Sequence, residues 1–220
     1  MVELPFQDRT DAGRLLGAEL ASRNIGPDPL VLALPRGGLP VAAEVADPLK
    51  APLDVVVVCK LGVPWQPELA MGAIAGTTRV LDHQLIRELR IPDEEVEAIV
   101  AREMREVARR EKLYRGGAVA PRLRGRTVVL VDDGLATGST MVAAARHIRE
   151  RNPRRLIVAV PVGSAQACGR LERDADEFVC MAVPEPFFAV GEWYVDFRQV
   201  TDSEVQEILK RSHIPVESLP

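Results

Sequence analysis

Apolar residues follow two different spacings along the chain. Short β-branched runs predict buried strands at 30–34, 53–59, 70–75, 128–132, 156–160 and 177–181. Longer segments with apolar residues three or four positions apart predict helices at 9–23, 39–49, 92–114, 139–150 and 165–173. Strands that alternate with helices predict an α/β fold: a single Rossmann-like domain over 1–220, with a mostly parallel sheet flanked by helices. In such sheets ligands bind at the carboxyl ends of the strands.

Glycine and proline mark the expected connections. Residues 60–69 contain Gly62, Pro64 and Pro67, and we expect a loop there after the second strand. Residues 79–81 are expected to pair with 70–75 as a hairpin. The stretches expected to be flexible are 61–69, 115–126 and the tail after Arg211.

The composition is that of a globular protein. A chain of 220 residues can bury a sizeable core, and the hydrophobic share of 47% and charged share of 27% are ordinary. The sequence has no apolar run of about 18 residues, so we expect no transmembrane helix. The first residues lack the basic and then apolar order of a signal peptide. The three cysteines are odd in number and lack metal-ligand spacing, which indicates reduced thiols and a cytoplasmic protein.

Charge is spread unevenly along the chain. The net charge of −4 gives no general attraction to nucleic acid, so a nucleic-acid partner is not expected. Residues 102–126 nevertheless carry nine basic and three acidic side chains. A solvated helix face is the simpler interpretation. Two alternatives stay open: some of these arginines face a polyanionic substrate, or the segment binds RNA.

The segment VVLVDDGLATGST, residues 128–140, combines the features of a ligand site. An apolar strand ends in Asp132 and Asp133, and a loop of small and hydroxylated residues then leads into a helix. Because a helix N-terminus presents free N–H groups and glycines allow close approach, the loop suits a phosphate. The carboxylates suit hydroxyl groups or a metal ion, so a phosphorylated sugar satisfies both halves. A solvated acidic turn at a strand end is the alternative, and a Walker A loop is excluded because no Gly-Lys-Ser/Thr follows.

A second candidate loop, LPRGG at 34–38, follows the first strand of the sheet. Gly37 and Gly38 can offer N–H groups to an anion at the start of the next helix. The guanidinium of Arg36 can bind two phosphate oxygens at once. Alone, an Arg-Gly-Gly triplet is also compatible with an ordinary turn.

Segment 128–140 resembles the phosphoribosyl-pyrophosphate motif of type I phosphoribosyltransferases, in which two acidic residues precede a short Thr-Gly-x-Thr-like loop. The resemblance implies that Asp132 and Asp133 hold the ribose hydroxyls and, through water, Mg²⁺. It implies that the ribose 5′-phosphate lies against Ala136, Thr137, Gly138, Ser139 and Thr140, with Gly134 as a further substrate-binding residue. It also implies that the LPRGG loop binds pyrophosphate through Arg36, Gly37 and Gly38, with a cis peptide bond at Pro35–Arg36.

The resemblance extends to a lysine and a loop after the second strand. Lys60 is expected at the carboxyl end of that strand, and the resemblance implies a catalytic role beside Arg36 on the pyrophosphate; a lysine that merely reaches solvent is the alternative. Segment 62–72 stands where the family has a mobile catalytic loop that excludes water. Trp65 and Glu68 are its candidate side chains, although Trp65 is equally suited to anchoring the loop.

Residues 190–197, VGEWYVDF, resemble the segment that covers the base in purine-type members of the family. The expected core is 28–182, and residues 183–200 with the N-terminal segment are expected to form a small hood. The resemblance implies that Trp193 and Tyr194 stack on a planar base and that Asp196 lies near the base or a second metal. Packing of the aromatic side chains as a core plug is the alternative.

The resemblance departs from the family at Ala136, where members that act on hypoxanthine and guanine place an acidic residue. It implies a Mg²⁺-dependent phosphoribosyltransferase that uses phosphoribosyl pyrophosphate and a small heterocyclic base. It also implies a homo-oligomer, expected to be a dimer. A sensor or regulator that binds phosphoribosyl pyrophosphate without catalysis is the alternative, and a phosphoribosyl hydrolase or phosphorylase-like activity is a third hypothesis. The identity of the base and of the general acid or base is open.

Overall fold

The computed structural model describes residues 2–171 and 173–212. Its larger sheet has five parallel strands in the order β2-β1-β6-β7-β8. Their bounds are Pro29–Ala33 for β1, Leu53–Val55 for β2, Thr127–Val131 for β6, Arg155–Val162 for β7 and Glu177–Ala182 for β8. This sheet confirms the predicted fold class.

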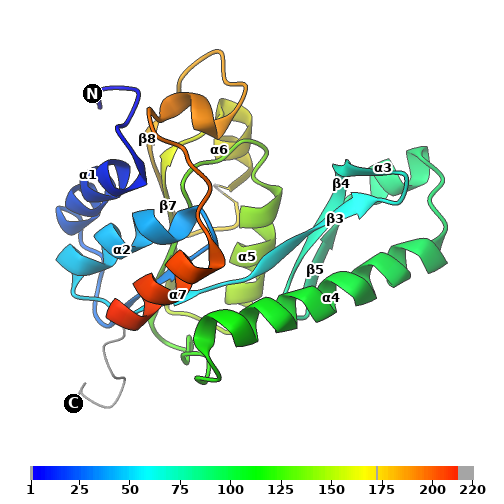
Figure 1. Cartoon of the computed structure of the whole chain (residues 1–220), viewed down its shortest axis with the longest axis horizontal. Helices are drawn as coiled ribbons and strands as arrows, with labels where there is room; N and C mark the ends of the chain where they lie inside the picture. Colours follow the sequence, from blue (N-terminus) through cyan, green and yellow to red (C-terminus); the bar gives the residue numbers. More distant parts are fainter. Residues whose placement is uncertain (1, 172, 213–220) are drawn as a thin grey trace.

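Helices cover both faces of the sheet (Figure 1). Alternate residues of each strand point to opposite faces, so Val31 and Ala33 share a core with α1 and α2, whereas Leu30 and Leu32 share a core with α5 and α6. The helices are α1 Arg9–Ala21, α2 Gly38–Leu49, α5 Ser139–Arg149, α6 Ala165–Leu171 and α7 Asp202–Arg211. In the described part of the chain, no helix combines the length and apolar character needed to cross a bilayer.

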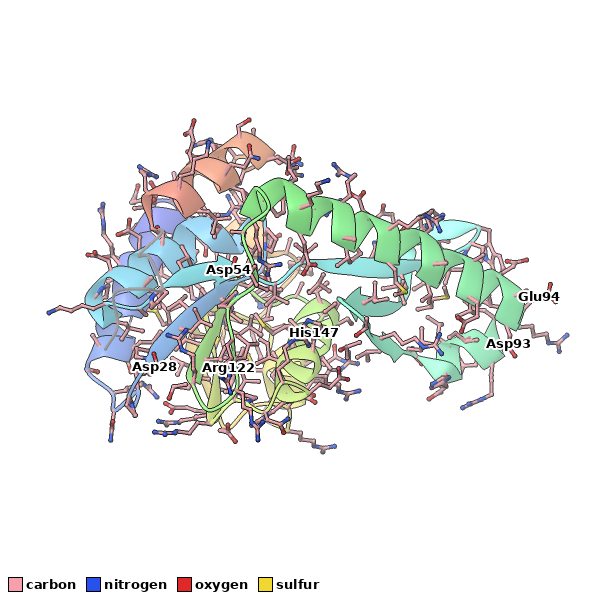
Figure 2. All side chains as sticks on the ribbon, turned by 90° about the horizontal axis from the view of Figure 1, so that it is seen from below. Asp28, Asp54, Asp93, Glu94, Arg122 and His147 are labelled. Carbon is pink, nitrogen blue, oxygen red and sulfur yellow. The ribbon has the colours of Figure 1, made fainter. Side chains whose placement is uncertain are left out.

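Residues 58–115 form an arm that projects from the sheet (Figure 1). It contains an antiparallel sheet and two helices: β3 Val58–Val63, β4 Gln66–Ala75, β5 Thr78–Leu81, α3 His83–Glu88 and α4 Asp93–Arg115. Figure 2 places Asp93 and Glu94 at the far end of the arm, in the first turn of α4. Their negative charges stabilise the N-terminus of this helix. The other end of α4 is tied to the body, because Arg115 pairs with Asp54 at 3.0 Å.

The charges of the arm are largely paired. The basic side chains of α4 with carboxylate partners are Arg102 with Glu103, Arg109 and Arg110 with Glu106, and Arg115 with Asp54. Arg102 and Arg109 are exposed, as expected of a solvated helix face, whereas the pair of Arg115 and Asp54 is mostly buried.

Two predictions about the second strand were wrong. The run 53–59 is split between the two sheets: 53–55 pair with β1, and 58–63 pair with β4. The expected loop 60–69 is a β-hairpin with a tight turn at 64–65. Register shifts around Gly62 accommodate the glycine and the prolines that suggested a loop. The helices α3 and α7 were not predicted, although Asp82 and a Thr201–Glu204 capping box begin them.

A buried histidine joins the arm to the body. His147 on α5 is 7% exposed, and its Nδ1 lies 2.9 Å from Oγ1 of Thr78 at the start of β5. The Thr78 hydroxyl donates to Glu150, and a Cβ at Gly76 would overlap the imidazole ring. Burial, with the charge of Arg151 as a smaller cause, lowers the pKa of His147 to about 4. Figure 2 shows His147 where the arm meets the body.

The lowered pKa of His147 predicts that the stability of the protein depends on pH. The unfolded chain binds a proton at His147 near pH 6.5, whereas the folded chain does so only near pH 4. The free energy of unfolding should therefore fall by up to about 3 kcal/mol as the pH drops from about 6.5 to about 4. Glu150, Arg151 and Arg115 are the charged groups that act on this histidine.

Urea unfolding of the wild type and of His147→Gln across this pH range measures the effect. In His147→Gln, the free energy of unfolding should lose the part of its pH dependence that corresponds to uptake of about one proton on unfolding. His83→Gln, which alters an exposed histidine on α3, should keep that pH dependence. An equal slope in wild type and His147→Gln would contradict the prediction.

Candidate active site

Three loops meet at the carboxyl edge of the parallel sheet. They follow β1 (34–38), β6 (132–138) and β7 (163–164). Backbone hydrogen bonds join them: the N–H of Leu34 donates to Val131 at 2.9 Å, and that of Ser164 donates to Leu135 at 2.9 Å. The fold thus brings both predicted ligand loops together.

The LPRGG loop packs directly on the two carboxylates. A Cβ at Gly38 would lie 2.9 Å from Cα and Oδ1 of Asp132, and a Cβ at Gly37 would overlap the carboxylate of Asp133. Only glycine therefore permits this approach. The peptide bond Pro35–Arg36 is cis, as the resemblance implied, and Gly38 begins α2.

The two acidic residues are partly buried and differ in their partners. Asp132 accepts a hydrogen bond from the N–H of Asp133 at 2.9 Å. Asp133 pairs with Arg9 of α1, whose Nε lies 2.7 Å from Oδ2. Burial raises the pKa of Asp132 well above its usual range, and the neighbouring charge of Asp133 raises it further. Burial also raises the pKa of Asp133, and Arg9 opposes that shift.

Arg9 belongs to the site but was not predicted. The only available signal was its position at the start of a helix, where a positive charge is unfavourable to the helix dipole. Nothing in the surrounding sequence indicated a partner 124 positions away.

The loop after β6 leads into the N-terminus of α5. Gly138 precedes Ser139 with a left-handed φ of 76°, which favours glycine. The carbonyl of Ala136 accepts from the hydroxyl of Ser164 at 2.7 Å. Thr137 is exposed, and Ser139 and Thr140 lie in the first turn of the helix. The free N–H groups of that turn are available to an anion.

Residues 183–200 contact the N-terminal segment over this edge. The N–H of Phe6 donates to Trp193, and that of Asp196 donates to Gln7, both at 2.9 Å. The ring of Tyr194 is buried between Phe6 and Phe197, with centroids 5.4 Å and 5.1 Å away. Its hydroxyl donates to the carbonyl of Asp133 at 2.6 Å. Tyr194 is therefore packed in the core, which agrees with the alternative interpretation of this segment as a core plug.

The other two residues of the predicted base cover are less enclosed. Trp193 is half-buried, and its ring lies 6.1 Å from that of Phe187. Asp196 is exposed, and its side chain accepts from the N–H of Arg198. Their contact with a base stays a prediction.

Lys60 does not lie where the sequence placed it. The parallel strand ends at Val55, and Lys60 lies on β3 of the arm. Its Nζ is 3.2 Å from a carboxylate oxygen of Glu68 on β4. Trp65 at the hairpin turn is 60% exposed. The premise that Lys60 ends a parallel strand was therefore wrong, and its contact with pyrophosphate stays a prediction.

A loop of small residues at a helix N-terminus lies beside two carboxylates and a glycine loop on one edge of a parallel sheet, an arrangement that suits a phosphorylated sugar or nucleotide. The family model of the phosphoribosyl transferase domain matches residues 11–198. The chain belongs to this family.

Curated relatives agree with this assignment. Two proteins of Mycobacterium tuberculosis, from strains CDC 1551 / Oshkosh and H37Rv, are each named "Putative phosphoribosyl transferase" and are 46% identical over 209 residues. The match covers 94% of this chain and 47% of theirs, so the chain spans about half the length of these relatives.

Among solved structures, TT1426 from Thermus thermophilus is 44% identical with a TM-score of 0.79, covering 94% of this chain and 99% of that one. The AQ2163 protein of Aquifex aeolicus is 15% identical with a TM-score of 0.51, covering 83% of this chain and 78% of that one. The second likeness shows the fold alone.

The contact between Gly37 and Asp133 generates a prediction. Gly37→Ala should displace the carboxylate or the loop, cost about 1–3 kcal/mol of stability through overpacking, and weaken binding of ribose 5-phosphate. Thermal melting and titration calorimetry measure both effects. Gly169→Ala is the control, because a Cβ there meets nothing within 4 Å. Equal melting temperatures and equal affinities of the two variants would show that the loop can accommodate a methyl group at position 37.

Proposed function

We propose that this protein is a Mg²⁺-dependent phosphoribosyltransferase that transfers the phosphoribosyl group of phosphoribosyl pyrophosphate to a nitrogenous base and releases pyrophosphate. The observation that carries the proposal is the packing of Gly37 and Gly38 on Asp132 and Asp133, beside the phosphate loop at 134–140. One ligand with a phosphate, a diol and a pyrophosphate matches these three neighbouring groups.

Each part of the ligand has a proposed partner. The 5′-phosphate is placed at the first turn of α5, where free N–H groups favour an anion. The ribose hydroxyls are placed at Asp132 and Asp133, which accept hydrogen bonds. The pyrophosphate is placed at Arg36 and the start of α2, with Lys60 as a further candidate from the arm.

The donor set suits Mg²⁺. Carboxylate oxygens are the protein ligands that this ion prefers, and it keeps several waters. Across residues 2–171 and 173–212 no cluster of three or more His, Cys, Asp or Glu side chains could hold a metal by itself. Asp132 and Asp133 would therefore hold the ion through water, together with oxygens of the ligand. When bound, the ion supplies positive charge that offsets the charge of the leaving pyrophosphate.

In the proposed reaction, the bond between ribose C1 and the pyrophosphate oxygen breaks, and a bond from C1 to a nitrogen of the base forms. The proton on that nitrogen passes to water or to the departing pyrophosphate. The protein contributes by holding the two reactants in line and by stabilising the departing charge with Arg36 and backbone N–H groups. Ala136 offers no acid or base to the acceptor. We therefore expect hypoxanthine and guanine to be poor acceptors.

Binding of phosphoribosyl pyrophosphate tests the proposal directly. Titration calorimetry with and without Mg²⁺ should show binding, and Asp132→Asn should weaken it by ~1.5–3 kcal/mol through loss of a charge-assisted acceptor. Asp93→Asn, at the far end of the arm, is the matched control (Figure 2). Absence of wild-type binding at millimolar ligand would refute the proposal. Binding without pyrophosphate release over a panel of bases would instead identify a sensor.

The acceptor side is tested at Trp193. If its half-buried ring stacks on the base, Trp193→Ala should raise the acceptor KM about tenfold or more and leave affinity for phosphoribosyl pyrophosphate nearly unchanged, because stacking is worth ~1–3 kcal/mol per base. The acceptor used is the base with the fastest pyrophosphate release in the panel. A lowered melting temperature with both constants changed together would assign Trp193 to packing alone.

A further inference from the structure

Arg9 is a buried cation in an unfavourable helix position. It is the first residue of α1 and is 9% exposed. Positive charge is disfavoured at a helix N-terminus, and burial of a guanidinium requires partners. A neutral or acidic residue at this position would stabilise the helix more than arginine does. The contacts of the Arg9 side chain must therefore account for the arginine.

Those contacts lie in the candidate site. Nε of Arg9 donates to Oδ2 of Asp133 at 2.7 Å, and Nη1 donates to the carbonyl of Arg198 at 2.9 Å. The guanidinium carbon stands 3.9 Å from the ring centroid of Phe197. Its remaining nitrogen, Nη2, faces the glycine loop, since a Cβ at Gly37 would lie 3.3 Å from it. The guanidinium is therefore fixed on several sides.

Asp133 is held from outside its own motif. Arg9 holds its carboxylate, and Tyr194 holds its backbone carbonyl at 2.6 Å. Asp132, in contrast, receives a hydrogen bond only from within the motif among the contacts of the described residues. The orientation of Asp133 thus depends on α1 and on the segment 194–198, which also contact each other.

We propose that Arg9 is a positioning residue, which fixes the carboxylate of Asp133 for the ribose of the ligand and couples that carboxylate to segment 194–198. The inference rests on the proposed function. A buried ion pair contributes little net stability compared with apolar packing, so stability alone does not account for the pair. Orientation does, because the bond of 2.7 Å fixes the position of one carboxylate oxygen of Asp133.

The test compares two arginines of one helix. Arg9→Ala should raise the Kd for phosphoribosyl pyrophosphate about tenfold or more, the effect expected for a misplaced charged acceptor. Arg9→Lys keeps the charge without the fork and should give a smaller loss. Arg14→Ala, which removes an exposed arginine paired with Glu44, should bind like wild type. Circular dichroism identifies any variant that is not folded, and Arg9→Lys serves if Arg9→Ala is not.

A double-mutant cycle separates positioning from packing. If Arg9 acts through Asp133, then adding Arg9→Ala or Arg9→Lys to Asp133→Asn should change the Kd by less than about threefold. A loss in that background as large as in the wild type would overturn the inference, as would an Arg9→Ala variant that binds like Arg14→Ala. Failure of the wild type to bind would overturn the proposed function and this inference with it. The wild-type titration therefore distinguishes the two failures.

Discussion

The site depends on one close contact, in which the backbone of Gly37 and Gly38 lies against the carboxylates of Asp132 and Asp133. Parallel pairing of β1 with β6 brings the two loops to the same edge, and the absence of side chains at 37 and 38 lets them touch. Burial that raises the pKa of both carboxyl groups follows from this packing. The arrangement concentrates acceptors and backbone donors within one ligand's reach, at the cost of enclosing two acidic groups.

The sequence predicted what is local. Patterns formed by residues close together in the sequence were predicted correctly. They are the strand, acidic pair and small-residue loop at 128–140, the LPRGG loop, and the alternation of strands with helices. The sequence pattern gave no sign that the run 53–59 is split between two strands, because both halves are β-branched and only their pairing partners differ. Lys60 was misplaced for the same reason. Arg9 and the hydroxyl of Tyr194 reach Asp133 from distant positions, so no spacing rule exposes them.

The part of the candidate site formed by residues 183–200 is built differently from the loop at 134–140. Its residues come from 183–200 and from the N-terminal segment, which are joined by backbone hydrogen bonds and by an isolated β-bridge between Phe6 and Tyr194. Aromatic packing and the Tyr194 hydroxyl hold this region to Asp133, rather than strand pairing of the main sheet. Segment 183–200 and the acidic pair are therefore directly connected, even though they lie on different elements.

The arm also has a consequence for the architecture of the protein. It is inserted between β2 and β6, and the parallel sheet pairs without any of its strands. Its attachments to the body include the ion pair of Arg115, at the end of α4, with Asp54 and the contact of His147 with Thr78. Figure 2 labels Asp54 and His147. In architectural terms the arm is an insertion: the parallel sheet is complete without its strands, yet the arm shares the hydrophobic core of the body and so extends that core beyond the sheet.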